Sequence, residues 1–182
     1  GRGHVFHSTG DTEVVLRSFI EWGSGAFERF NGMFALALWD GVSQTLHLAR
    51  DAMGIKPLYW LLRADGLVFA SEIKAFPALA DFHARMDERS LHQYLEFGYV
   101  FDEQASMLAG VNKLTPGHRL EVRDGKVVAD VAFFVPPAPD RADARSEADR
   151  LDELGAVLER VVDEHLIADV PVGLLLSGGL DS

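Results

Sequence analysis

Residues 33–39 read Met-Phe-Ala-Leu-Ala-Leu-Trp, a continuous apolar run that ends at the turn residues Asp40 and Gly41. A second apolar stretch follows at residues 45–49. The two stretches predict a β-hairpin, and because their apolar residues do not alternate with polar ones, we expect both strands to be buried on both faces. This hairpin is the starting point for the fold.

Two further hairpins are predicted by the same pattern, in which two strand-like segments flank an Asp-Gly turn. They comprise residues 57–62 with 67–70, and residues 119–122 with 126–134. Strands in such quick succession predict a mainly antiparallel sheet. Helices are predicted where apolar residues recur at helical spacing. These helices are residues 8–22, with Ser8, Thr9 or Asp11 as the cap, and residues 27–30, 72–79, 87–97 and 146–168.

The composition narrows the class of protein. The chain has 182 residues, a formal net charge of −11 and no cysteine. This length is enough for one domain and part of another. The acidic balance argues against a nucleic-acid-binding surface, since phosphates are met by clustered Lys and Arg. Without cysteine, these residues hold no disulfide, zinc–thiolate site or thiol nucleophile. No apolar run reaches membrane-spanning length, so we expect no membrane association and a cytoplasmic location.

Residues 135–144 differ in composition from the rest of the chain. Pro136, Pro137 and Pro139 lie among Ala, Asp and Arg without any apolar period. Such composition is typical of a semi-rigid linker. We therefore expect a first domain at residues 1–135, a linker at 136–145 and a second domain that begins at 146.

The C-terminal residues carry the most specific chemical signal. An apolar segment at residues 170–176 predicts a buried strand, and it leads directly into Ser177-Gly178-Gly179-Leu180-Asp181-Ser182. Two glycines allow close approach of the backbone to a ligand, and successive N–H groups favour an anion. An aspartate suits such a site if Mg²⁺ bridges it to phosphates. The spacing differs from that of the Walker loop, which also requires a lysine.

This string resembles the pyrophosphate-binding loop of the PP-loop ATP pyrophosphatases. Enzymes of that family cleave ATP to AMP and pyrophosphate while they adenylate a substrate. The resemblance implies ATP and Mg²⁺ as cofactors, with Asp181 as the residue linked to the metal. The nucleotide-binding residues that it implies are Leu175, Ser177, Gly178, Gly179, Asp181 and Ser182.

Four upstream strings form a second constellation. They are Gly-Asp-Thr-Glu-Val at 10–14, Asn-Gly-Met-Phe-Ala at 31–35, Arg-Asp-x-x-Gly-Ile-Lys-Pro-Leu-Tyr at 50–59, and Ala-Ser-Glu-Ile-Lys-Ala at 70–75. Taken singly, each has a structural explanation: a helix cap, a turn, a local ion pair of Arg50 with Asp51, and a solvated face at Glu72 and Lys74. In this order, they resemble the class II glutamine amidotransferase domain.

That resemblance implies an α+β N-terminal-nucleophile glutaminase sandwich with antiparallel sheets, of which the chain would hold a part. The first helix and strand of an α/β PP-loop domain would follow. Amidotransferase strings followed by a PP-loop string are similar to the glutamine-hydrolysing asparagine synthetases of the bacterial B type. Residues 91–100 and 114–118 also match strings of that family.

The family's chemistry implies roles for two residues of this chain. A terminal cysteine thiolate attacks the glutamine amide. Ammonia then passes through a tunnel and displaces AMP from β-aspartyl-AMP, which forms from aspartate and Mg-ATP. Asp11 matches the acid that holds the α-amino group of glutamine, and Met33 falls at the tunnel wall. The family's cysteine, its glutamine-binding arginine and its Asn-Gly-Glu string precede the Asp11 motif, so we expect no catalytic residue here.

We therefore expect an internal part of a longer enzyme, which by itself neither hydrolyses glutamine nor makes asparagine. The expected partners are the small molecules glutamine, aspartate and ATP, with no nucleic acid and no membrane, and a homodimer of the whole enzyme is left open. Two other functions also remain open. One is a paralogue without the nucleophile, like the β-lactam-forming synthetases; the other is an amidotransferase of the same architecture that acts on another carboxylate. The specific phosphate loop argues against a non-catalytic interaction module.

Overall fold

The structure is a computed structural model that describes residues 3–138 and 145–180. It forms two compact units, Gly1–Pro136 and Pro137–Ser182, called here the first and second units. None of the described helices is long and apolar enough to cross a membrane.

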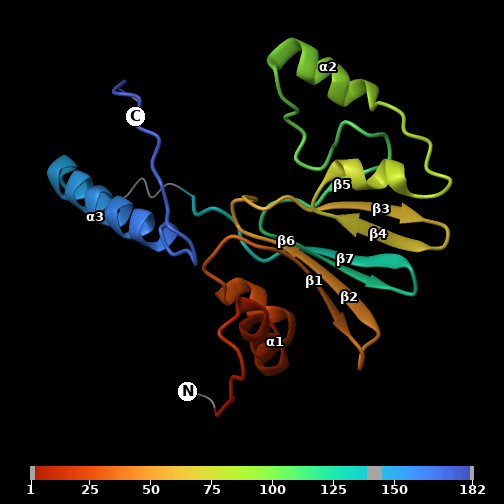
Figure 1. Ribbon diagram of the computed structural model, residues 1–182, viewed down its shortest axis with the longest axis horizontal. Helices are drawn as coiled ribbons and strands as arrows, with labels where there is room; N and C mark the ends of the chain where they lie inside the picture. Colours follow the sequence, from red (N-terminus) through yellow and green to blue (C-terminus); the bar gives the residue numbers. More distant parts are fainter. Residues whose placement is uncertain (1–2, 139–144, 181–182) are drawn as a thin grey trace. The chain divides into compact units, whose positions relative to one another are not determined.

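The first unit contains two antiparallel sheets (Figure 1). The four-stranded sheet has the order β1 (Ala35–Asp40), β2 (Thr45–Arg50), β6 (His118–Arg123) and β7 (Lys126–Ala132). The three-stranded sheet has the order β4 (Gly66–Ala70), β3 (Tyr59–Arg63) and β5 (Asn112–Lys113). All three predicted hairpins are present. The first and second hairpins nevertheless belong to different sheets, which the succession of strands alone did not separate.

The core of the first unit lies between the two sheets. It is built from Leu48 of β2, Leu120 of β6, and Leu58 and Leu114 of the segments that border the smaller sheet. Strand β2 is buried along most of its length, as its apolar sequence predicts. The same prediction is wrong for β1, because β1 is an edge strand and Trp39 remains 58% exposed.

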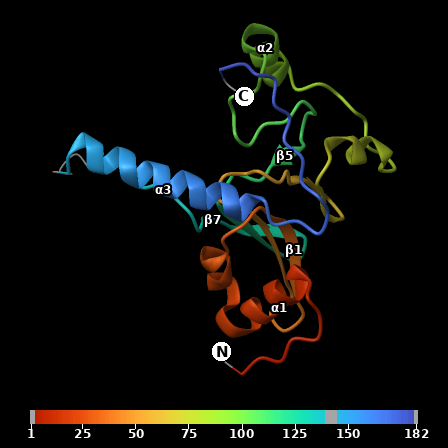
Figure 2. The same cartoon turned by 60° about the vertical axis from the view of Figure 1, so that its left-hand side comes forward.

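Helices lie at opposite ends of the first unit, with the sheets between them (Figure 1 and Figure 2). In chain order they are α1 (Asp11–Trp22), the 3₁₀ helices η1 (Gly23–Arg29) and η2 (Ile73–Ala78), and α2 (Glu88–Phe97). Helix α1 packs against β2, where the ring centroids of Phe19 and His47 lie 5.1 Å apart. Helix α2 is capped by Asp87, as predicted, through a 2.8 Å bond from the Ser90 N–H.

The predicted caps of α1 are wrong, because the cap residue is Gly10 and it makes no side-chain hydrogen bond. Glu13 in the first turn instead reaches back to the preceding segment. Its carboxylate accepts from the N–H of Ser8 at 2.7 Å and from the Ser8 hydroxyl at 2.8 Å. The chain before α1 is therefore held from inside the helix, and Asp11 takes no part in capping.

The second unit contains the predicted long helix, α3 (Glu147–His165), which begins with a capping box formed by Ser146 and Asp149. The strand predicted at residues 170–176 is wrong, because these residues have no regular secondary structure and are exposed. A strand is stable only when a neighbour accepts and donates its backbone hydrogen bonds. Within the described residues, no strand pairs with this segment.

Candidate functional site

An open pocket of about 510 Å³ in the first unit is the candidate site. Three parts of the chain line it. They are Asp11, Thr12, Val15 and Leu16 of α1; residues 33–39, which include β1; and Lys56, Pro57 and Ser71 of two loops. The pocket thus combines an apolar strand with one carboxylate and one ammonium group.

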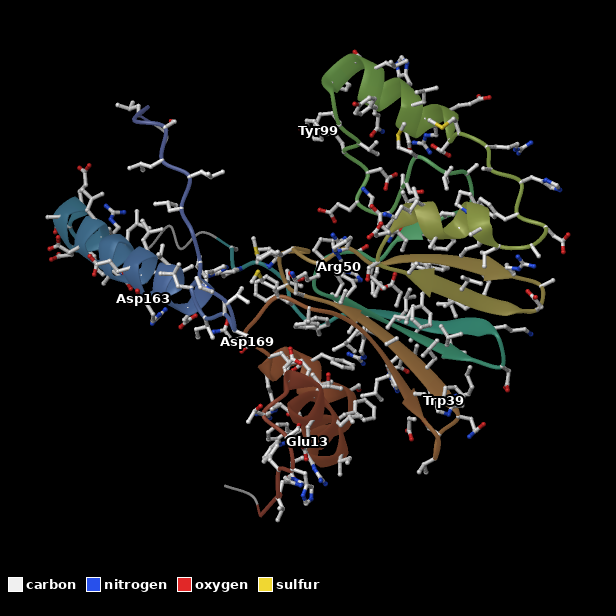
Figure 3. All side chains as sticks on the ribbon, viewed as in Figure 1. Glu13, Trp39, Arg50, Tyr99, Asp163 and Asp169 are labelled. Atoms are coloured by element: carbon white, nitrogen blue, oxygen red, sulfur yellow. The ribbon has the colours of Figure 1, made fainter. Side chains whose placement is uncertain are left out.

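Asp11 is the first residue of α1 and lines this pocket. Within the part of the chain that the structure describes, no donor is bonded to its carboxylate. Glu13, labelled on α1 in Figure 3, is already engaged, and the hydroxyl of Ser8 that donates to it lowers the pKa of Glu13. Of the two acids in the first turn, Asp11 is therefore the one available to a cationic group of a ligand.

Met33 lines the same pocket and is 44% exposed. The structure therefore brings together the two residues of the first unit that the sequence singled out. Sequence reasoning missed Lys56 and Ser71 as pocket residues, although both stand in quoted strings. The available signal was their position next to the second predicted hairpin: Lys56 lies shortly before β3, and Ser71 directly follows β4.

Asp51 stands directly after β2 and organises the loop at residues 51–57. Its side chain is buried, at 1% exposure. The carboxylate accepts four backbone hydrogen bonds, from Phe34 at 3.3 Å, Met53 at 3.2 Å, Ile55 at 2.9 Å and Lys56 at 2.9 Å. Two of these donors, Phe34 and Lys56, belong to residues that line the pocket.

Arg50 binds the carbonyl groups around the same loop. Its guanidinium donates to the oxygens of Gly54 at 2.7 Å, Lys56 at 2.9 Å and Leu114 at 2.8 Å. Burial lowers the pKa of Arg50, while the charge of Asp51 opposes that shift. Figure 3 shows Arg50 at the centre of the first unit. The local ion pair of Arg50 with Asp51 is therefore not what holds these side chains, because both make their hydrogen bonds with the backbone.

The pair at Glu72 and Lys74 matches its simpler interpretation. Its atoms Oε2 and Nζ lie 2.5 Å apart, and both side chains are largely exposed. The bond to Glu72 raises the pKa of Lys74. This is the solvated face that the sequence allowed, and it adds nothing to the pocket.

The structure describes residues 177–180 of the predicted phosphate loop. Gly178 adopts a left-handed conformation with φ of 78°, and the Gly179 N–H donates to the Ser177 hydroxyl at 3.2 Å. Leu175 is 98% exposed. Asp181 and Ser182 lie outside the described residues. The loop residues that the structure describes, 177–180, contain no carboxylate, since Asp181 is the acid of this string.

Comparison with known protein families gives matches to both parts of the chain. A sequence model of the glutamine amidotransferase domain matches residues 1–133. A model of asparagine synthase matches residues 153–182. The two matches have the order of the two string constellations found in the sequence.

Three curated relatives illustrate the range of similarity. The chain is 39% identical over 185 residues to a putative glutamine-hydrolysing asparagine synthetase of Mycobacterium tuberculosis, which covers 99% of the chain. It is 35% identical over 182 residues to glutamine-hydrolysing asparagine synthetase 3 of Bacillus subtilis, covering 100% of the chain. It is 33% identical over 179 residues to amidase chyE of Penicillium rubens, covering 97%. The chain spans only 28%, 29% and 26% of the lengths of these relatives.

Proposed function

Because the chain belongs to the glutamine amidotransferase domain family and continues into the start of an asparagine synthase domain, we propose that it is part of an ATP-dependent asparagine synthetase. Glutamine would be hydrolysed to glutamate and ammonia in the first half of that enzyme. Aspartate and ATP would form β-aspartyl-AMP and pyrophosphate in the second half. Ammonia would then displace AMP and give asparagine.

The observation that carries this proposal is the pocket around Asp11. A free amino acid bears an ammonium group, and a carboxylate without a partner among the described residues suits it through a charge-assisted hydrogen bond. The apolar residues of β1 suit the methylene groups of the glutamine side chain. Met33 would form part of the wall along which ammonia leaves. The chain contains no cysteine, so the proposed nucleophile would belong to sequence outside these residues.

We propose the same division of the chain as the sequence suggests. Residues 1–135 would belong to the glutaminase domain, residues 136–145 would link the domains, and residues 146–182 would begin the synthetase domain. Support comes from the spans of the two family matches, which end at 133 and resume at 153. ATP would be a substrate of the second domain, bound as Mg-ATP at the loop formed by Leu175, Ser177, Gly178, Gly179, Asp181 and Ser182.

The test is an assay of the complete protein that contains these residues. With glutamine, aspartate and Mg-ATP, we expect asparagine, glutamate, AMP and pyrophosphate in equal amounts. The chain of 182 residues alone should release no glutamate above background. Glutamate release by the complete protein without any asparagine would show that the acceptor is another molecule. Absence of both products would show that the protein is not a glutamine amidotransferase.

A second candidate is an amidotransferase of the same architecture with a different carboxylate acceptor. It is favoured by the similarity of the chain to two proteins named amidases, chyE of Penicillium rubens and chry2 of Gibberella zeae, at 33% and 34% identity. Pyrophosphate release that depends on a carboxylate other than aspartate would identify this function.

A further inference from the structure

We propose that Asp51 is a positioning residue for the glutamine reaction, because its buried carboxylate fixes two segments of the pocket wall relative to each other. One segment is the lead-in to β1 at Phe34, and the other is the loop at Lys56. The inference rests on the proposed function of the pocket. It assigns to Asp51 neither contact with substrate nor a role as acid or base.

A single oxygen of Asp51 joins the two segments. Oδ2 accepts from the N–H of Phe34 at 3.3 Å and from the N–H of Lys56 at 2.9 Å. The backbone N–H of Asp51 also donates to the carbonyl oxygen of Phe34 at 2.8 Å. Phe34 is therefore held at both of its backbone polar groups by one residue. Met33 and Phe34 on one side, and Lys56 and Pro57 on the other, line the pocket.

The second oxygen fixes the loop itself. Oδ1 accepts from the N–H groups of Met53 and Ile55 at 3.2 Å and 2.9 Å. Arg50 takes the carbonyl groups of Gly54 and Lys56. The loop belongs to no β-sheet. Its N–H donors are therefore met by the side chain of Asp51 and its carbonyl acceptors by the side chain of Arg50. An alternative conformation of the loop would leave the buried carboxylate of Asp51 without these donors, which disfavours it.

The four donors match the acceptor sites of a carboxylate. A carboxylate offers acceptor sites on both oxygens, whereas an amide replaces one oxygen with an NH₂ group, which is itself a donor. In an Asp51→Asn variant, two N–H groups would therefore face a donor, either those of Phe34 and Lys56 or those of Met53 and Ile55. In the first case the loop loses its link to the β1 lead-in, and in the second it loses the two bonds that fix its own conformation.

Displacement of this wall has two consequences for an amidotransferase. Glutamine would bind less well, because the groups around it are no longer held in position. Ammonia would also escape, because Met33 directly precedes the residue that Asp51 holds. The second consequence separates positioning from general stability, since a protein that is merely less stable makes less product but keeps the ratio of its products.

The experiment uses the complete protein and its Asp51→Asn variant. We expect kcat/KM for glutamine to fall by about 10- to 100-fold, mainly through KM, as misplaced binding groups do. The amount of asparagine formed per glutamate should fall below the wild-type ratio. Synthesis from added ammonium salt bypasses glutamine and should be unchanged, which also shows that the variant folds.

The matched control is Asp102→Asn. Asp102 also accepts two backbone N–H groups, from Gln104 at 2.9 Å and Ala105 at 3.1 Å, but it is exposed and does not line the pocket. The substitution Asp102→Asn should leave KM for glutamine and the ratio of asparagine to glutamate unaltered. An Asp102→Asn effect as large as that of Asp51→Asn would overturn the proposal.

A second variant, Arg50→Lys, keeps the test decisive if Asp51→Asn fails to fold. Lysine cannot reach three carbonyl groups from three separate nitrogens, so the Lys56 side of the wall alone is released. We expect a smaller rise in KM and a smaller loss of product ratio. If a folded Arg50→Lys protein keeps the wild-type KM for glutamine and the wild-type ratio of asparagine to glutamate, the inference about Asp51 is overturned. If the wild-type protein itself hydrolyses no glutamine, the proposed function fails instead, so the two failures are distinguishable.

Discussion

Two motif regions of this chain, residues 51–57 and residues 170–180, differ in how many bonds hold them in place. The side chains of Arg50 and Asp51 make five hydrogen bonds to the backbone of the loop at residues 51–57 and two more to Phe34 and Leu114. The segment at residues 170–180 has no regular secondary structure and is exposed throughout. The segment at 170–176 is as apolar as a buried strand, yet no strand forms there, so local sequence does not explain the difference.

The two regions differ in the hydrogen-bond partners that the rest of the chain supplies to them. Asp51 receives a donor from Phe34, and Arg50 reaches Leu114, so the loop depends on residues far away in the sequence. Those residues are present in the first unit. The segment at 170–180 has no strand beside it in the described residues. A motif therefore becomes a site only when its distant partners are part of the same folded unit.

Hydrogen exchange should show the largest contrast between the two regions. The amides of Leu46, Leu48 and Ala49 in β2 are paired with β1 and β6. Exchange from a stable sheet requires an opening of several kcal/mol, so these amides should exchange at least about 10³-fold more slowly than those of residues 172–176. Site-resolved exchange of the 182-residue chain measures this ratio. Comparable rates in both regions would mean that the comparison is wrong.

Substitution of one glycine in each unit should have opposite effects. Gly54 has φ of 65°, and an added Cβ would lie 2.7 Å from Cγ of Pro116 and 3.0 Å from Cζ of Arg50. Gly54→Ala should therefore destabilise the first unit by about 3–5 kcal/mol, the sum of strain and overpacking. Urea unfolding followed by tryptophan fluorescence measures the loss.

Gly155 in α3 provides the matched substitution, because an added Cβ there meets nothing within 4 Å. Gly155→Ala should stabilise the helix by about 1 kcal/mol, the difference in helix propensity. Helical circular dichroism would report it. If Gly155→Ala destabilises the protein, or if Gly54→Ala does not, the two glycines do not differ in packing as the structure indicates.

Particular residues show what could be predicted from sequence. The three hairpins and helices α1, α2 and α3 follow from apolar periodicity and from Asp-Gly turns, which act within a few residues. The exposed edge of β1 did not follow, because burial of Trp39 depends on which strands lie beside it. Asp11 and Met33 were chosen from strings, but their common pocket depends on the packing of α1 beside β1. The role of Asp51 could not be read at all, since its donors converge only in the folded chain.

The N-terminal cap of α3 should contribute less to stability than the loop at residues 51–57. Ser146 Oγ accepts from the Asp149 N–H at 3.1 Å, and the Asp149 carboxylate accepts from the Ser146 N–H at 3.2 Å. Loss of such a cap in Ser146→Ala costs about 1 kcal/mol. The amides of the first turn should then exchange about 5-fold faster. Asp152→Asn, an exposed change outside the cap, should leave them unaltered; equal effects of the two variants would contradict the capping role.

The smallest expected effect concerns His47, a titratable group buried in the first unit at 6% exposure. Its ring packs against Phe19, and its Nδ1 has no hydrogen-bond partner in the described structure. Glu121 Oε1 is 4.0 Å away and is already bonded to Arg119 at 3.2 Å. Burial lowers the pKa of His47; Glu121 and Asp40 oppose this shift, and Arg119 and Arg123 support it.

A lowered pKa in the folded state means that the unfolded chain binds the proton first as the pH falls. Above the ordinary histidine value of 6.5, His47 is neutral in both states and contributes no pH dependence. Below that value, stability should fall with decreasing pH, by at most about 1.4 kcal/mol per pH unit for one proton, and then level off once the folded state is protonated. His47→Leu should flatten the plot of unfolding free energy between pH 8 and 5, whereas His83→Leu at an exposed position tests the loss of a histidine elsewhere. If both variants keep the wild-type dependence of unfolding free energy on pH, burial of His47 is not coupled to folding. In that case, Glu121 would have to compensate the charge of the protonated ring.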